Sequence, residues 1–334
     1  MSKPRAIADR VEIEARAAYI TELGAPEVIR YGVVPIPAIG PTDVLVRSEA
    51  LAVNPVDCLI RAGVYRTPTP FPFIVGRDVA GVVVVAGPGA AGFAVGDRVW
   101  SNSLGHGGRQ GSFSDYVVVA ADRCYHLPDA VSADAAVAVF HPAATAYLAL
   151  FRHANLQPGE TVYVGGGAGN VGRATIELAA AAGARVIASA RPEDFDDCAA
   201  LGASAVVDYQ DGAAAVAKAA SEGVDVYLDT SGHHDFAAAL EVLAKGGRIV
   251  LMAGTARVPL PVSALFQRDA RLVGFVISDA LVSDLAAAAA LINKRLAAGG
   301  LKPRIASTMT LADTAQAHRL VEARTVRGRI VLHP

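Results

Sequence analysis

The sequence is poor in cysteine and has no excess of charge of either sign. Only three of the 334 residues are cysteines, Cys58, Cys124 and Cys198, and no CxxC pair occurs. Neither a disulfide framework nor a cysteine-based zinc lobe can be built from them, so we expect a reduced, cytoplasmic protein. The 30 Lys and Arg residues nearly balance 32 Asp and Glu residues. A net charge of −2 offers no basic field to bind nucleic acid or an anionic membrane.

Long hydrophobic runs are also missing. Residues 1–14 lack the apolar core of a secretory signal, and no later stretch has 18 apolar residues without Gly, Pro or charge. We therefore expect a soluble chain with a short mobile leader over residues 1–14. Hydrophobic residues nevertheless make up 53% of the chain and charged residues only 19%, which excludes disorder as the main state. At roughly 150 residues per domain, the length suggests about two domains.

The hydrophobic pattern changes along the chain. Residues 15–127 form short β-like runs separated by turn signals such as Gly40-Pro41 and Gly96-Asp97, which predicts a mostly β domain. Residues 128–264 alternate apolar strands with Ala-rich helical stretches, which predicts an α/β domain with a doubly wound parallel sheet. After that, helices within 282–298 and around 312–323 precede a closing strand, GRIVLHP. We expect residues 265–334 to return to the first domain.

The strongest local signal is a glycine-rich turn between a strand and a helix. An apolar strand over 161–164 runs into Gly167-x-Gly169-x-x-Gly172, a helix containing residues 174–182 follows, and a second strand covers 185–189. Glycine is needed there for a tight turn, for close approach of backbone N–H groups to a pyrophosphate, and for packing of the helix on the strand. We predict a dinucleotide site formed by these glycines together with Asn170 and Val171.

The end of the second strand indicates which dinucleotide binds. Sites for NAD usually have an acidic residue there, about 20 residues past the first glycine. This sequence has Ser189, Ala190 and Arg191 instead. A 2′-phosphate would meet one guanidinium and no carboxylate, so we predict NADPH rather than NADH. Glu193 and Asp194 follow closely, and the alternative that one of them binds the ribose in a slightly longer loop stays open.

Several motifs point together to one family. They are AAYITELGAPEV, NPVDCLIRAGVY, TAYLALFRHANLQPGETVYV, GASAVVDY, GGRIVLMAG and GRIVLHP. With the glycine-rich turn, the chain after Glu14 resembles the zinc-independent, zeta-crystallin-like quinone oxidoreductases of the medium-chain dehydrogenase/reductase superfamily. The resemblance implies a GroES-like catalytic domain, a Rossmann domain that binds NADPH, an active site in the cleft between them and a homodimer.

The same comparison bears on metal. In zinc-dependent alcohol dehydrogenases of this superfamily, a Cys opens the motif matched here by Asn54-Pro55-Val56-Asp57, and Gly-His-Glu occupies the place of Gly76-Arg77-Asp78. A catalytic zinc needs three protein ligands, and Asn and Arg are not among the usual ones. His141 stands at the place of the third ligand, and one imidazole cannot hold zinc alone. We therefore expect no metal site.

The resemblance also implies roles for single residues. Asn54 matches a residue beside the nicotinamide ribose, Tyr65 a tyrosine that faces the substrate, and Thr145 a threonine that approaches the nicotinamide ring. Each could instead be structural: a turn former, a surface tyrosine and a helix-packing threonine. Further cofactor contacts are expected near the adenosine 2′-phosphate or after successive strands of the Rossmann domain, at Ser189, Arg191, Tyr209, Ser231, Gly254 and Val276.

These observations lead to one expected function and one alternative. We expect an NADPH-dependent reductase of quinones or α,β-unsaturated carbonyls without a catalytic metal, with Tyr65, Asn54 and His141 as catalytic candidates. His141 departs from the apolar residue usual in the family, and imidazole titrates near neutral pH, so it could deliver a proton, although a lone histidine is more often structural. The alternative is a non-catalytic NADPH-binding protein. The loop over residues 101–114, with His106 and Arg109, could be a lid or a solvated loop.

Overall fold

A computed structural model describes residues 13–254 and 256–334, and the chain divides into two compact units. Unit 1 contains the described residues up to Ala138 together with Ile305–Pro334, and unit 2 is Val139–Arg304. The chain passes from unit 1 to unit 2 inside helix α2 (Ala133–Tyr147). Residues 1–12 of the expected leader lie outside the described residues, and strand β1 (Glu14–Ile20) already begins at the leader's last residue.

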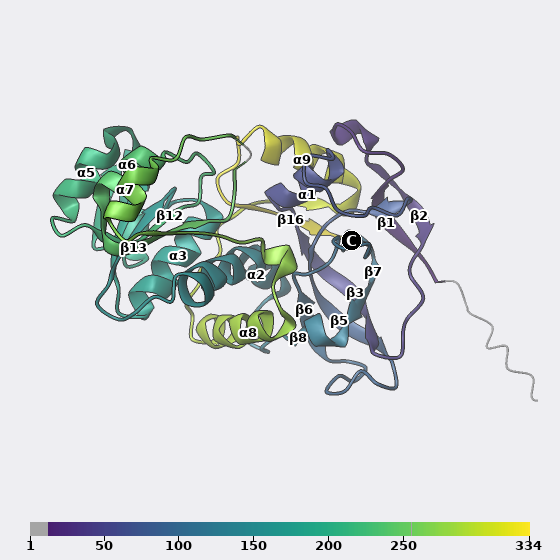
Figure 1. The fold of residues 1–334 in the computed structure, drawn as a ribbon. Helices are drawn as coiled ribbons and strands as arrows, with labels where there is room; N and C mark the ends of the chain where they lie inside the picture. The colour runs from purple at the N-terminus through teal and green to yellow at the C-terminus, as the bar shows by residue number, and fades with distance from the viewer. Residues whose placement is uncertain (1–12, 255) are drawn as a thin grey trace, which may run out of the picture. The chain divides into compact units, whose positions relative to one another are not determined.

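Unit 1 is built from two β-sheets (Figure 1). The smaller sheet is antiparallel, in the order β2 (Arg30–Pro35), β1, β4 (Phe73–Ile74). The larger sheet runs in the order β15 (Ile305–Thr310), β16 (Arg329–His333), β3 (Asp43–Ala52), β5 (Asp78–Ala86), β6 (Arg98–Ser101), β8 (Tyr125–His126), and β7 (Tyr116–Ala120) also pairs with β3. The predicted β domain is confirmed, and the closing strand GRIVLHP returns to it as β16, antiparallel to β3.

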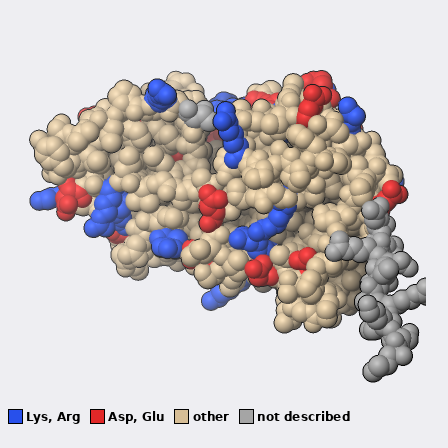
Figure 2. All heavy atoms as spheres, turned by 45° about the vertical axis from the view of Figure 1, so that its right-hand side comes forward, with Lys and Arg blue, Asp and Glu red and all other residues tan. Residues whose placement is uncertain are grey.

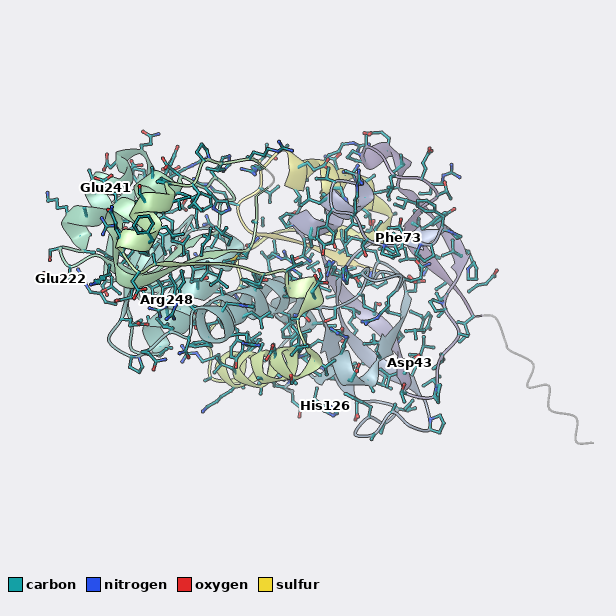
Figure 3. All side chains as sticks on the ribbon, in the orientation of Figure 1. Asp43, Phe73, His126, Glu222, Glu241 and Arg248 are labelled. Carbon is teal, nitrogen blue, oxygen red and sulfur yellow. The ribbon has the colours of Figure 1, made fainter. Side chains whose placement is uncertain are left out.

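Two short α-helices accompany these sheets: α1 (Pro55–Arg61) and α9 (Thr314–Glu322). The core of unit 1 lies between them and the strands, and its buried aromatic side chains include Phe73 and Phe113. Figure 3 labels Phe73 at its place on β4. All three cysteines of the chain are free and buried.

Unit 2 contains one six-stranded sheet in which every pairing is parallel. The order is β11 (Ala205–Asp208), β10 (Arg185–Ala190), β9 (Thr161–Gly165), β12 (Val224–Asp229), β13 (Leu243–Leu251), β14 (Arg271–Gly274). Numbered along the chain, this is the 3-2-1-4-5-6 order of a Rossmann fold. The order of successive strands reverses between β9 and β12, and such sheets bind dinucleotides at this switch point.

Helices connect the strands of this sheet. They are α3 (Asn170–Ala181), α4 (Phe195–Ala200), α5 (Gly212–Ala219), α6 (Phe236–Val242) and α7 (Val262–Gln267), and α8 (Val282–Ala297) follows the last strand, β14. Helices α5, α6 and α7 pack against one another beside β12 and β13 (Figure 1). The Ala-rich composition suits these connections because alanine has the highest helix propensity.

The amino-terminal side of this sheet is closed by an arginine. Arg248 of β13, labelled in Figure 3, donates from Nη1 and Nη2 to Glu160 at 2.8 and 2.7 Å, and from Nε to the Ala154 carbonyl at 2.9 Å. A bidentate, mostly buried guanidinium of this kind fixes its surroundings strongly. Open parallel sheets bind ligands at the opposite side, outside the carboxyl ends of the strands.

The expected boundary at residue 264 was wrong. Residues 265–304 belong to unit 2, because β14 completes the parallel sheet beside β13 and the chain enters unit 1 only at Ile305. The other boundary also shifts, from residue 127 to Ala138. The sequence pattern weakens after residue 262 because β14 has only four residues, all at least partly exposed at the sheet edge. Such a strand carries no long apolar run to recognise.

Helix α2 continues as a π-helical segment, Leu148–His153, and contains Pro142. Among the described residues, this combined stretch, Ala133–His153, is the one helix long and apolar enough to cross a membrane by length and composition. Its most apolar window is 78% buried inside the protein. It is thus a core helix by its packing. Figure 2 shows charged side chains of both signs scattered over the visible face.

Candidate functional site

The glycine-rich turn lies at the switch point of the unit 2 sheet. It leaves β9 at Gly165, which pairs with Asp229 of β12, and Gly169 caps the amino end of α3. An ideal Cβ added to Gly172 would lie 2.2 Å from the Gly166 carbonyl oxygen, so glycine is required for helix and turn to approach. The amino end of α3 with its unpaired N–H groups fits a pyrophosphate. The geometry therefore suits the dinucleotide predicted from the sequence.

Three further residues support the glycine-rich turn, and they were not singled out from the sequence. Gly166 adopts a φ of +71°, a conformation that favours glycine. Thr230, directly after β12, donates from its hydroxyl to the Gly165 carbonyl at 2.8 Å. The Tyr163 hydroxyl donates to the Ser189 hydroxyl at 2.9 Å. The only signal for Gly166 in the sequence was its place in the middle of the run Gly165–Gly167, and the hydroxyls of Thr230 and Tyr163 gave none.

Ser189 itself supports the turn. Its carbonyl accepts from the Gly167 N–H at 2.8 Å, its hydroxyl accepts from the Gly166 N–H at 3.4 Å, and the residue is 3% exposed. The structure thus places this predicted cofactor contact beneath the glycine-rich turn, where it shapes the site. A direct contact with the cofactor stays a prediction.

Arg191 and Tyr209 come together at the carboxyl edge of neighbouring strands. Ala190 of β10 pairs with Asp208 of β11, so the two residues that follow these strands are adjacent. Arg191 is exposed, and its guanidinium makes no hydrogen bond or ion pair within the described part of the chain. Tyr209 is 54% exposed and its hydroxyl accepts from Gln210. This edge offers a cation and a phenol to a ligand, as the sequence predicts for the 2′-phosphate.

Ser231, Gly254 and Val276 follow the carboxyl ends of β12, β13 and β14, so all three lie on the predicted side of the sheet. Gly254, at φ +111°, lies against His234, whose Nε2 is 2.5 Å from the Ala253 carbonyl oxygen. His234 thus contacts the segment after β13. Val276 is 40% exposed.

His141 and Thr145 are one turn apart on α2. The Thr145 hydroxyl donates to the His141 carbonyl at 2.9 Å, and the two residues are 7% and 8% exposed respectively. This back-bond is common for threonine in helices and does not by itself indicate a ligand site. Their predicted roles, in hydride geometry and in proton delivery, stay predictions.

In unit 1, Tyr65 is half-buried beside the loop over residues 101–114. Its ring lies 6.1 Å from the His106 ring, and its hydroxyl makes no hydrogen bond to a described residue. The Thr67 hydroxyl is 3.3 Å from His106 Nδ1 and accepts from the Gly107 N–H at 2.9 Å. The loop is therefore fastened to the segment that carries Tyr65, and the phenol remains available to a substrate.

Asn54 lies inside a buried polar cluster. Its Nδ2 donates to Asp78 at 2.9 Å, and its Oδ1 accepts from Arg329 at 2.8 Å. Arg329 also donates to Asp78 at 2.9 Å, and the Asn54 N–H donates to Asp57 at 2.8 Å to cap α1. All of these residues are at most 3% exposed, and so is Arg77. Both ends of the Asn54 amide are thus engaged within unit 1, which fixes the amide and the start of α1.

Burial dominates the ionisation of this polar cluster. It raises the pKa of Asp78 to about 7 and that of Asp57 to about 6, although Arg329 and Arg77 oppose the change. Burial also lowers the pKa of Arg329. Asn54, Arg77 and Asp78 occupy the places of the zinc-enzyme motifs; here Asn54 donates to Asp78, and the buried Arg77 charge acts on the pKa of Asp57 and Asp78. No group of three His, Cys, Asp or Glu among the described residues could hold a metal ion, and the absence of zinc from the native protein stays a prediction.

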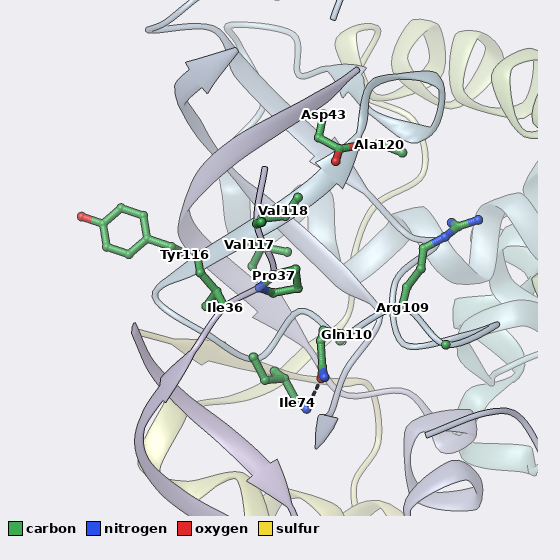
Figure 4. Close-up of a pocket in the computed structure, with 13 residues that line it drawn as sticks. Ile36, Pro37, Asp43, Ile74, Arg109, Gln110, Tyr116, Val117, Val118 and Ala120 are labelled. Carbon is green, nitrogen blue, oxygen red and sulfur yellow. Dashed lines mark hydrogen bonds between the residues drawn. The ribbon is translucent and has the colours of Figure 1, made fainter. Parts of the chain in front are cut away.

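A pocket of about 450 Å³ opens elsewhere in unit 1 (Figure 4). Its lining includes Ile36, Asp43 and Tyr116, and Gln110 crosses its floor to accept from the Ile74 N–H at 2.6 Å. None of the predicted site residues lines it. Arg109 of the loop over residues 101–114 is also among its lining residues.

Comparisons with known proteins agree with both units. Residues 40–129 match the alcohol dehydrogenase GroES-like domain, and residues 170–294 match the zinc-binding dehydrogenase family. A quinone oxidoreductase of Lama guanicoe is 30% identical over 325 residues, which covers 95% of this chain and 97% of that protein.

Solved structures agree as well. An NAD-dependent alcohol dehydrogenase is 31% identical with a TM-score of 0.86 and covers 96% of this chain and 99% of its own. A mycobacterial protein, Rv1454c, solved in complex with NADPH, is 29% identical with a TM-score of 0.85 and covers 96% and 100%. The chain is thus an NAD(P)-dependent oxidoreductase of α/β fold. It belongs to the quinone oxidoreductase family of the medium-chain dehydrogenase/reductase superfamily.

Proposed function

We propose that the protein is an NADPH-dependent reductase of quinones or α,β-unsaturated carbonyls that works without a catalytic metal. The observation that carries this proposal is the carboxyl edge of the unit 2 sheet. The turn at Gly166–Gly172 suits a pyrophosphate, and Arg191 with Tyr209 offers a cation where an NAD site usually has an acid. The quinone oxidoreductase relatives support the acceptor class, and the mycobacterial relative bound to NADPH supports the cofactor.

The residues of the chain would have separate tasks. The amino end of α3 and Arg191 would bind the phosphates, and the back-bonded Thr145 would shape the wall beside the nicotinamide. NADPH would supply a hydride, which leaves negative charge on the acceptor oxygen. The Tyr65 hydroxyl could donate a hydrogen bond to that oxygen, and solvent or His141 could return the proton. A quinone suits this arrangement because aromatisation drives its reduction.

Arg191→Ala is expected to weaken NADPH binding by roughly ten- to a hundredfold and to leave NADH binding nearly unchanged. A charge-assisted hydrogen bond to a phosphate contributes about 1.5–3 kcal/mol. The variant loses this hydrogen bond only with NADPH, because NADH has no 2′-phosphate. Dissociation constants of both cofactors, measured by titration of native protein and variant, check this. Equal affinity of the native protein for the two cofactors would contradict the proposed cofactor choice.

Tyr65→Phe is expected to slow the reduction of an enone about tenfold more than that of a quinone. The enone depends on a hydrogen bond to its developing oxyanion, whereas aromatisation assists the quinone. Steady-state turnover with a panel of both acceptor classes, with NADPH and NADH side by side, measures the difference. Cofactor binding without turnover of any acceptor would favour the non-catalytic alternative instead.

We also propose a homodimer and a cytoplasmic location. Strand β14 is an edge of the unit 2 sheet, and exposed apolar residues, Phe266 at 68% and Val276 at 40%, lie on the elements before and after it. An exposed strand edge is a template for pairing with a second copy. Light scattering that gives twice the chain mass of 34.3 kDa would support the dimer, and the chain mass alone would contradict it.

A further inference from the structure

Four charged side chains of unit 2 form a cluster at the segment that follows Arg191 in the chain. Arg304 Nη1 donates to Asp194 at 3.3 Å and to Asp197 at 3.4 Å, and Arg173 of α3 donates to Asp197 at 3.3 Å. The Asp194 side chain is 8% exposed and that of Arg304 is 29% exposed. Two guanidinium groups thus neutralise two carboxylates, and Arg191 remains beyond the cluster without a charged partner among the described residues.

Asp194 is linked directly to Arg191 by the backbone. Residues Pro192–Asp194 form a single 3₁₀ turn that Arg191 caps, and the Asp194 N–H donates to the Arg191 carbonyl at 2.9 Å. The backbone positions of Arg191 and Asp194 are therefore coupled through this turn. Asp194 in turn is held by Arg304, which lies 110 residues further along the chain and is the last residue of unit 2.

The charge of Asp194 matters for the cofactor. A 2′-phosphate carries close to two negative charges at pH 7. If Arg191 binds this phosphate, an uncompensated Asp194 carboxylate one turn further along the chain would repel the phosphate. We infer that Arg304 is a positioning residue that determines selectivity for NADPH, because it neutralises Asp194 and fixes the turn that presents Arg191. This inference rests on the proposed function, in which Arg191 binds the 2′-phosphate. It also accounts for Asp194, which the sequence left as an alternative ligand of the ribose.

The test is a double-mutant cycle read as the ratio of NADPH affinity to NADH affinity. Arg304→Met should lower this ratio about tenfold, because Asp194 loses the guanidinium that neutralises it. Asp194→Asn alone should raise the ratio a few-fold, because it removes a negative charge near Arg191 while Arg304 keeps its positive charge. The double variant, Arg304→Met with Asp194→Asn, should return to within about twofold of the native ratio. A merely structural role would lower both affinities together and leave the ratio unchanged.

Arg295→Met is the matched control. Arg295 is 34% exposed and pairs with Glu177 of unit 2 at 3.4 Å. The substitution therefore removes a similar ion pair that does not involve residues 191–197. Its ratio should equal that of native protein. If Arg191→Ala lowers the ratio while Arg304→Met and Asp194→Asn leave it unchanged, this inference is overturned and the proposed function stands. If native protein binds both cofactors equally, the proposed cofactor choice and this inference both fail. Asp194→Asn keeps the test decisive if Arg304→Met does not fold.

Discussion

Gly172→Ala is expected to weaken dinucleotide binding more than a hundredfold and to lower the thermal stability of unit 2. The added Cβ would lie 2.2 Å from the Gly166 carbonyl oxygen and 2.8 Å from the Gly167 Cα, both of which are backbone atoms. Neither can move aside as a flexible side chain would, so α3 must shift away from the turn. The N–H groups at its amino end would then no longer converge on a pyrophosphate.

Gly89→Ala in unit 1 is the matched control. Its Cβ would be 3.2 Å from the Pro41 carbonyl oxygen, and Gly89 is exposed and is none of the predicted cofactor contacts. We expect an affinity within about twofold of native protein, since a shift of a few tenths of an ångström relieves the contact. Titration with NADPH and thermal unfolding of both variants check the pair. Equal effects of the two substitutions would show that the approach of helix and turn is not what the site requires.

Arg329→Met is expected to destabilise unit 1 by about 3–5 kcal/mol at pH 8, because it removes one partner of a buried ion pair. Asp78 and Asn54 would lose hydrogen bonds of 2.9 and 2.8 Å, and Asp78 is fully buried. Trp100, the only tryptophan of the chain, is 1% exposed in unit 1, so its fluorescence during urea unfolding reports on this unit alone.

The loss should be smaller at pH 5 than at pH 8. Burial raises the pKa of Asp78 to about 7, above its value near 4 in an unfolded chain, so the folded state binds this proton more tightly. On account of this group, the free energy of unfolding falls as pH rises from about 4 to about 7. Without Arg329 the pKa of Asp78 rises further, so at pH 5 the residue is neutral and its burial costs less.

Arg319→Met provides the control for this prediction. Arg319 pairs with Glu27 at 2.9 Å, but the side chains are 45% and 62% exposed. Exposed pairs contribute little, so the variant should stay within about 0.5 kcal/mol of native protein at both pH values. If Arg329→Met is equally destabilising at pH 5 and pH 8, Asp78 does not carry the proton assigned to it.

The sequence was most informative where one local motif requires one geometry. The turn at Gly167, Gly169 and Gly172 predicted the switch point of the sheet, because strand, turn and helix are contiguous in the chain. Arg191 and Tyr209 were also placed at the correct edge, since both directly follow strands. That Arg191 and Tyr209 lie next to each other follows from the parallel pairing of β10 with β11.

Partners distant in sequence could not be predicted. Arg329 reaches Asn54 across 275 positions, and Arg304 reaches Asp194 across 110. Only the folded sheets bring such side chains together, and a single arginine leaves no pattern that names its partner. The contacts of Ser189 could not be predicted for a related reason. Its position near the carboxyl end of β10 indicates the ligand side of the sheet, but nothing in the sequence shows that its hydroxyl accepts from the Tyr163 hydroxyl and from the Gly166 N–H.

The placement of β16 also sets the order in which the chain can fold during synthesis. Unit 2 is one continuous segment, whereas unit 1 needs β16 between β15 and β3 and needs Arg329 beside Asp78. The ribosome makes Arg329 only after the whole of unit 2. Until then β3 lacks β16 as a neighbour, and two carboxylates, Asp57 and Asp78, lack one of their counter-charges. Unit 1 therefore waits in an incomplete state that exposes strand edges, and this makes it the half of the protein more prone to misfolding or to chaperone binding.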